Sequence, residues 1–181
     1  MTNIQNLLER QPFVKSLMVQ IGEIASKQKK KAYAVGGAVR DVFIGKELKE
    51  IDIMVIGDGI EFAKVVAKQM GVPKIVPFHR FSTAHIPSRP IPIEIAAARK
   101  ETYSKDSRKP NKVTYTNLEG DLLRRDFTVN AMAVDLLPDN FGNLYDPYNG
   151  LKDLLSKQLI TPMDPDAVSY THLTLPTILS V

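Results

Sequence analysis

Two carboxylates in the run "EIDIMV", residues 50–55, constrain the fold of this chain more than any other feature. Glu50 and Asp52 alternate with apolar residues at positions 51, 53 and 55, which is the pattern of a β-strand with one buried face. Because residues i and i+2 of a strand point to the same side, we expect the two carboxylates to stand next to each other. A strand that only fills a core has no use for this pair of charges.

Neighbouring carboxylates repel each other unless a cation lies between them. A hard divalent cation with a preference for oxygen ligands, above all Mg²⁺, is the natural partner of Glu50 and Asp52. The alternative is a solvated sheet face that happens to carry two acidic residues.

A glycine pair stands shortly before this strand. Gly36 and Gly37 follow the apolar run "AYAV" (32–35) and precede a segment that we expect to be helical as far as Gly45. A backbone without Cβ atoms at the start of a helix suits phosphate oxygens, and Arg40 lies one turn further on. The alternative is a plain strand-to-helix turn. A P-loop and a dinucleotide fingerprint are both excluded, because neither glycine pattern is present.

The remaining periodicity predicts an α+β fold with a mixed sheet flanked by helices. An amphipathic helix, or two, is expected over residues 5–30, with Phe13, Leu17, Ile21 and Ile24 on one face. Further strands are expected at 32–35, 51–56, 84–87, 91–98 and 127–137, and helices from 60 to 70 and around 118–126. The polar stretch 99–112 predicts a loop.

Composition sets wider limits. The 181 residues lack cysteine, which excludes disulfides and thiolate metal sites, and the net charge of +4 is compatible with an anionic partner such as RNA or with a lysine-rich surface. We find no apolar segment long enough to span a bilayer and therefore expect a soluble, cytoplasmic protein without a membrane partner.

Several motifs, taken in order, resemble one family. A glycine pair followed by an acid-x-acid strand resembles the polymerase β superfamily, in which a later strand supplies a third carboxylate; Glu94 in "IPIEIAAA" has that setting. The segments "YAVGGAVRDVFIG", "EIAAARKETY", "LEGDLLRRDFTVNAMAVDL" and "LYDPYNGLKDLLSKQLITP" resemble the head domain of class II tRNA nucleotidyltransferases (CCA-adding enzymes) and bacterial poly(A) polymerases. The resemblance covers about residues 30–167.

The resemblance implies a role for each matching residue. Glu50 and Asp52 would bind Mg²⁺, with Glu94 as the third catalytic carboxylate. Gly36, Gly37 and Arg40 would hold the triphosphate, and Asp41 would order their turn. The nucleotide would also contact the residues of the "RRDFTVN" run, namely Arg124, Arg125, Asp126 and Asn130. The alternative for this run is an Arg–Asp ion pair that joins a helix to a strand.

The implied activity is template-independent addition of CCA to the tRNA 3′ end from ATP and CTP. Poly(A), CC or A addition, and an inactive nucleotide- or RNA-binding module, remain alternatives. The inactive module is motivated by Glu50, because the family usually has aspartate there and Mg²⁺ tolerates displaced ligands poorly. We expect reduced but real activity.

The sequence predicts that the chain is divided into four segments. We expect an N-terminal helical segment at 1–30, the head domain at 31–160 and the start of a linker to a missing helical neck at 161–167. Residues 168–181, "VSYTHLTLPTILSV", resemble the translation of sequencing-adapter DNA and are expected to be non-native. A head without its neck is expected to bind NTPs weakly and to add little or no ordered CCA.

Overall fold

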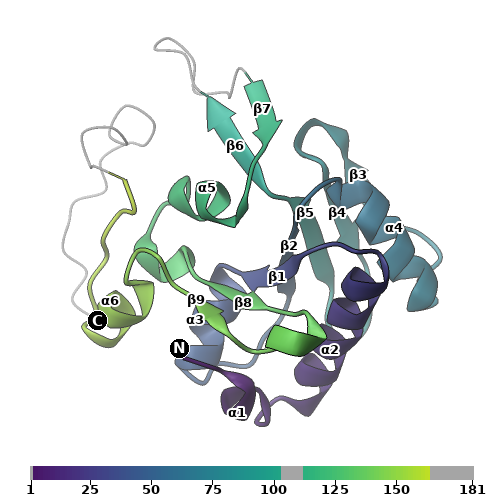
Figure 1. Cartoon of the computed structure of the whole chain (residues 1–181). Coiled ribbons are helices and arrows are strands. Elements are labelled where there is room, and N and C mark those ends of the chain that lie inside the picture. The colour runs from purple at the N-terminus through teal and green to yellow at the C-terminus, as the bar shows by residue number, and fades with distance from the viewer. Residues whose placement is uncertain (1, 103–111, 164–181) are drawn as a thin grey trace.

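The computed structural model describes residues 2–102 and 112–163 and is built on a seven-stranded sheet (Figure 1). The strand order is β3-β4-β5-β2-β1-β8-β9. The strands are β1 (Ala32–Val35), β2 (Ile51–Val55), β3 (Val76–Phe78), β4 (Thr83–Ile86), β5 (Ile93–Ala97), β8 (Ala133–Asp135) and β9 (Leu144–Tyr145). Strands β2 and β5 pair in parallel and the other neighbours are antiparallel, so the prediction of a mixed sheet is confirmed.

Helices flank this sheet. They are α1 (Gln5–Leu8), α2 (Pro12–Lys27), α3 (Gly37–Phe43), α4 (Gly59–Gln69), α5 (Leu118–Leu123) and α6 (Gly150–Leu155). Proline at the first position of α2 is compatible with the helix because its missing N–H has no intrahelical partner there. Gly22 allows α2 to approach the sheet closely, since a Cβ atom at this position would lie 1.7 Å from the carbonyl oxygen of Leu136.

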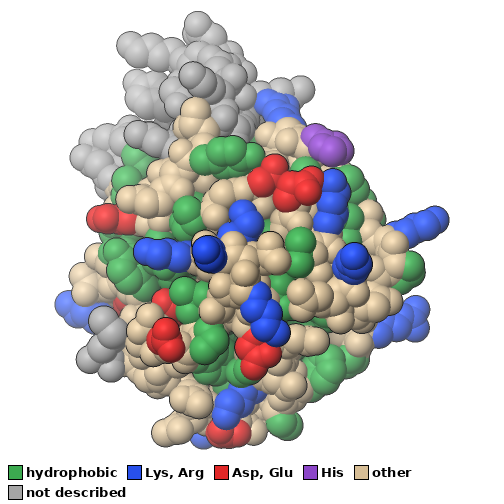
Figure 2. All heavy atoms as spheres, turned by 45° about the vertical axis from the view of Figure 1, so that its right-hand side comes forward, with side chains coloured by type: hydrophobic (Ala, Val, Ile, Leu, Met, Phe, Trp, Pro, Cys, Tyr) green, Lys and Arg blue, Asp and Glu red, His purple; other side chains and the backbone are tan. Residues whose placement is uncertain are grey.

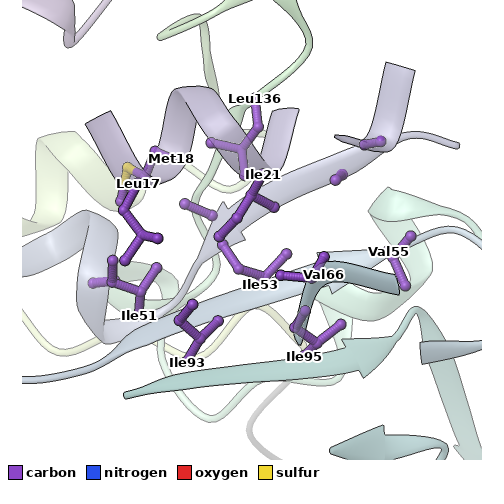
Figure 3. Close-up of a cluster of buried hydrophobic side chains, with 14 of the residues drawn as sticks. Leu17, Met18, Ile21, Ile51, Ile53, Val55, Val66, Ile93, Ile95 and Leu136 are labelled. Atoms are coloured by element: carbon purple, nitrogen blue, oxygen red, sulfur yellow. The ribbon is translucent and has the colours of Figure 1, made fainter. Parts of the chain in front are cut away.

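The main core lies between one face of the sheet and helices α2 and α4 (Figure 3). The alternating residues Ile51, Ile53 and Val55 of β2 are buried there, as the sequence predicts. The neighbouring strand β5 adds Ile93 and Ile95 to the same face. The opposite face of β2 therefore presents Asp52 to the other side of the sheet.

The prediction of the buried helix face is wrong for one residue. Phe13 is 47% exposed, and Val14 takes the buried position at the start of α2. The buried residues of α2 then follow steps of three and four, at Val14, Leu17, Met18, Ile21 and Ala25, together with Ile24. Phe13 lies one residue away from this stripe and instead lines a surface groove.

Two segments differ from the sequence prediction. The predicted loop 99–112 begins and ends in strands, because β6 (Arg99–Thr102) pairs with β7 (Lys112–Tyr115) as a separate hairpin, and residues 103–111 lie outside the described part. The strand predicted over 127–137 is a strand only at β8; residues 128–130 form a 3₁₀ helix. The hydroxyl of Thr128 donates to buried Asp153 in α6 at 2.6 Å, and this tertiary contact holds the turn in place.

Candidate active site

Asp52 and Glu94 stand side by side on the sheet face that points away from α2 and α4. Parallel pairing of β2 with β5 makes these two residues register partners. Glu50 is exposed and lies one residue before the start of β2, so it is not part of the strand as predicted. It nevertheless acts on Asp52 electrostatically.

The pKa of Asp52 is raised to about 6, by burial first and then by the negative charges of Glu50 and Glu94. Arg125 acts in the opposite direction and lowers this pKa. The three predicted carboxylates therefore share one electrostatic site, in which negative charge is poorly compensated. A cation bound at this site would relieve the repulsion.

Gly36 lies between strand β1 and helix α3, close to the guanidinium of Arg125. Its φ of 68° and ψ of −134° belong to a region that residues with a Cβ rarely adopt. A Cβ atom at this position would lie 2.7 Å from Nη1 of Arg125 and 3.8 Å from Oδ2 of Asp52. Glycine is thus required twice, for its backbone conformation and for the space that the Arg125 guanidinium occupies.

A pocket of about 210 Å³ lies in front of Asp52. Carboxylates of Asp52 and Glu94 line it together with guanidiniums of Arg99, Arg124 and Arg125; we call this the carboxylate–arginine pocket. Its remaining lining residues are Val35, Ile53, Met54, Thr83, Ala96 and Asp121. Negative and positive groups meet here across a small space, which suits a metal ion together with the phosphates that it binds.

Most of the other predicted residues form a second group, the Arg40 chain. Arg40 donates from Nε to Asp41 at 2.9 Å and from Nη1 to the side-chain oxygen of Asn130 at 2.7 Å. The Asn130 amide donates in turn to Asp126 at 3.2 Å. A Cβ atom on Gly37 would lie 3.4 Å from Nη2 of Arg40, so this guanidinium lies against the glycine turn.

The structure therefore divides the "RRD" run. Arg124 and Arg125 pair with Asp121, whereas Asp126 belongs to the Arg40 chain. The two groups meet where Nη1 of Arg125 donates to the backbone oxygen of Asn130 at 3.4 Å. Asp121 was missed as a site residue, although its spacing of three and four residues before the arginines is the spacing of helical ion pairs.

The oxygen donors fit an open Mg²⁺ site rather than a closed one. Residues 2–102 and 112–163 contain no group of three or more His, Cys, Asp or Glu side chains that could enclose a metal ion. Mg²⁺ commonly uses one or two carboxylates and completes its octahedron with water and substrate phosphates. Asp52 and Glu94 supply two carboxylates to the lining of the pocket, and Glu50 is close enough to raise the pKa of Asp52.

A larger groove of about 660 Å³ lies elsewhere, between the start of α2 and the loop after α3. None of the predicted site residues lines it, and its walls mix apolar residues with the charged residues Arg10, Glu47 and Lys49. We place the chemistry in the smaller pocket because charge and hydrogen-bonding groups converge there.

The visible surface is mixed in charge. Figure 2 shows Lys and Arg side chains spread among acidic and apolar ones on this face, without one continuous basic patch. In the part of the chain that the structure describes, no helix has the length and apolar character needed to cross a membrane.

Comparison with known proteins identifies the family that the sequence resembles. The sequence model of the poly(A) polymerase head domain matches residues 32–160. The chain belongs to this family. An A-adding tRNA nucleotidyltransferase of Aquifex aeolicus is 45% identical over 127 residues, which are 70% of this chain and 15% of the relative. An A-adding tRNA nucleotidyltransferase of Halalkalibacterium halodurans is 35% identical over 139 residues, 76% of this chain and 32% of the relative.

Solved structures agree on the fold of this head domain. An apo form of a CCA-adding enzyme is 32% identical with a TM-score of 0.82, over 94% of this chain and 40% of the other. A tRNA nucleotidyltransferase complexed with a primer tRNA and an incoming ATP analog is 39% identical with a TM-score of 0.69, over 79% and 39%. The chain thus spans less than half the length of each of these proteins.

Proposed function

We propose that this head domain catalyses nucleotide addition to the 3′ end of tRNA, using ATP and CTP with Mg²⁺, and that it acts in the cytoplasm. The observation that carries the proposal is the register pairing of Asp52 with Glu94, beside Glu50 and opposite the arginines of the carboxylate–arginine pocket. The relatives named as tRNA nucleotidyltransferases support tRNA as the acceptor. The related complex with a primer tRNA and an ATP analog supports the choice of substrates.

The residues take the following roles in the proposed reaction. Glu50 and Asp52 would hold Mg²⁺, which, when bound, supplies positive charge to the phosphates and favours ionisation of the attacking hydroxyl. Glu94 is the third carboxylate beside them. Gly36, Gly37 and Arg40 bind the triphosphate, and Asp41 holds Arg40 by an ion pair of 2.9 Å.

Arg124 and Arg125, which directly follow α5, line the same pocket and supply charge to the phosphates. Asp126 contacts the ribose hydroxyls, and Asn130 shapes the wall by joining Arg40 to Asp126. In the transfer, the RNA 3′-hydroxyl oxygen bonds to the α-phosphorus and gives up its proton to water. The bond from that phosphorus to the β-phosphate oxygen breaks, and pyrophosphate leaves. The side chains act by position and charge, with no covalent intermediate on the protein.

Which nucleotides are added is a finer question. CCA addition is our first proposal, and A addition is favoured by the names of the two relatives reported above. CC addition and poly(A) synthesis use the same chemistry at the same pocket. Incorporation into tRNA that lacks the whole CCA, the final CA or the final A separates these activities.

A nucleotide-binding module without activity is the candidate from another class. Glu50 favours it, because a side chain one methylene longer than aspartate displaces a metal ligand. Its exposed position before β2 leaves it fewer packing contacts to correct that displacement.

Incorporation of labelled ATP or CTP into tRNA tests the proposal. A native protein that contains this head domain should incorporate label with Mg²⁺ and stop when EDTA is added. Asp52→Asn should abolish incorporation while the protein stays folded. Nucleotide binding without any incorporation would favour the inactive module, and absence of both would contradict nucleotide transfer altogether.

A further inference from the structure

Asp121 is a buried carboxylate at the centre of the arginine wall. It lies in α5 and is 1% exposed, although it carries a charge. Such a group is stable only when its oxygens accept enough hydrogen bonds. Asp121 accepts four: from the backbone N–H of Arg99 at 3.1 Å, from Nε and Nη2 of Arg124 at 3.1 and 2.9 Å, and from Nη2 of Arg125 at 3.1 Å.

The two oxygens divide their partners. Oδ1 accepts from Arg124 and from the start of β6, and Oδ2 accepts from Arg125. Nε of Arg124 also donates to the carbonyl oxygen of Arg99 at 3.1 Å, so this guanidinium is held between α5 and the base of the hairpin. Charge-assisted contacts of this kind fix a flexible side chain in one orientation.

The orientation that results is the one the pocket needs. Arg124 and Arg125 line the carboxylate–arginine pocket opposite Asp52 and Glu94. Nη1 of Arg125 reaches the space in front of Gly36, while its Nη2 stays on Asp121. Each guanidinium thus has one part tied to Asp121 and a surface on the pocket.

We propose that Asp121 is a positioning residue that aims Arg124 and Arg125 at the phosphates of the bound nucleotide. The proposal rests on the proposed function, because it takes a nucleoside triphosphate as the ligand of this pocket. Asp121 itself does not touch the ligand; it acts through the two arginines. The competing explanation is purely structural, in which Asp121 only joins α5 to the hairpin.

Asp121→Asn is the direct test, with Asp135→Asn as its control. Asp135 is a half-buried aspartate in β8 that accepts a hydrogen bond from the backbone N–H of Leu137 at 2.8 Å and is not one of the residues that line the pocket. Equilibrium binding of ATP with Mg²⁺ to the 181-residue chain is measured for each. We expect Asp121→Asn to weaken ATP binding about 10- to 100-fold, the range typical of an outer partner that orients a ligand-binding group, and Asp135→Asn to change it less than about twofold.

A variant without the two arginines distinguishes a positioning role of Asp121 from general destabilisation of the fold. When Arg124 and Arg125 are both replaced by Gln, Asp121→Asn should cause no further loss of ATP affinity, because the groups through which it acts are gone. An additional loss of the same size in that background would overturn the proposal. So would equal losses from Asp121→Asn and Asp135→Asn.

A measurement without nucleotide keeps the two proposals distinguishable. In the wild-type chain, NMR of the arginine side chains should show slow rotation about the Nε–Cζ bonds of Arg124 and Arg125, and separate Nη signals. Averaged signals like those of free arginine would overturn the role of Asp121, even if Asp121→Asn does not fold. Held arginines in a protein that fails to bind ATP would instead overturn the proposed function, and with it the phosphate as their target.

Discussion

At the scale of single residues, the length of one side chain tests the metal site. Glu50 stands where the family usually has aspartate, one residue before β2. Glu50→Asp shortens the side chain by one methylene and should bring its carboxylate to the distance that octahedral Mg²⁺ requires. We predict that the rate of labelled-nucleotide incorporation rises by up to about tenfold, since small misplacements are costly in catalysis. Glu50→Gln, which removes the charge, should lower it; an unchanged rate in Glu50→Asp would show that position 50 does not hold the metal.

The raised pKa of Asp52 predicts how the stability of the folded protein depends on pH. Its pKa is raised from 3.8 to about 6, by burial first and by Glu50 and Glu94 next. Between these values the folded protein holds a proton that the unfolded chain has lost, so stability falls as pH rises from about 4 to 6. At pH 7 ionised Asp52 costs the fold on the order of 2–3 kcal/mol. Asp52→Asn should therefore unfold at higher urea than wild type at pH 7, and this advantage should vanish near pH 3.5.

Asp58 provides a control with the opposite sign. Burial raises its pKa, but hydrogen bonds from the Glu61 backbone, the Ser82 hydroxyl and the Ile60 backbone outweigh burial and lower it. A carboxylate of this kind stabilises the fold above its unfolded pKa, and the stabilisation is lost as pH falls. Asp58→Asn should be less stable than wild type at pH 7. If both variants shifted in the same direction at pH 7, the electrostatic explanation for Asp52 would be wrong.

At the scale of elements, the spacing of apolar residues predicts those helices and strands whose position depends mainly on burial of one face. The strands β1, β2 and β5 can be predicted because they are short apolar segments, in which residues such as Ile51 and Ile53 alternate. Pro12 indicates the start of α2. Elements fixed by tertiary contacts were not found: the 3₁₀ turn at 128–130 depends on Asp153, and the β6–β7 hairpin has a polar sequence. The pairing of Asp52 with Glu94 could not be predicted either, because it requires that β5 add in parallel beside β2.

The N-terminal segment has an element-scale role that its sequence does not reveal. The Gln11 side chain donates to the carbonyl oxygen of Lys46 and accepts from the N–H of Leu48, both at 2.9 Å. It thereby holds the loop that leads from α3 to Glu50. Gln11→Leu removes both bonds and leaves an apolar side chain that is one atom shorter; each bond is worth about 1 kcal/mol.

We predict faster amide hydrogen exchange at Leu48 in Gln11→Leu, by about tenfold. Exchange in β1 should stay unchanged, since the core there is not affected. Gln20→Leu is the matched control, because Gln20 is exposed on the same helix. Equal protection of Leu48 in Gln11→Leu and wild type would mean that the loop is held by burial of Leu48 alone.

At the scale of the whole molecule, the kind of group around the pocket limits what the head can select. Apart from apolar residues and Thr83, the lining of the carboxylate–arginine pocket consists of carboxylates and guanidiniums. These groups recognise a metal ion and phosphates, which all four NTPs share. The family resemblance implies that the base is read by hydrogen bonds from a helical neck, and the chain spans 15% and 32% of the lengths of the two A-adding relatives.

We therefore predict that the 181-residue chain binds ATP, CTP, GTP and UTP with Mg²⁺ at affinities within about tenfold of one another, a difference of about 1.4 kcal/mol. Binding should weaken for all four to a similar extent in Arg125→Gln, because the lost contact is to phosphate. Competition against one labelled nucleotide measures all four affinities under the same conditions. Strong preference for ATP or CTP, or ordered addition of C, C and A by this chain, would show that the head reads the base by itself. The arginines would then be the first residues to examine, since guanidinium groups can also pair with the edge of a base.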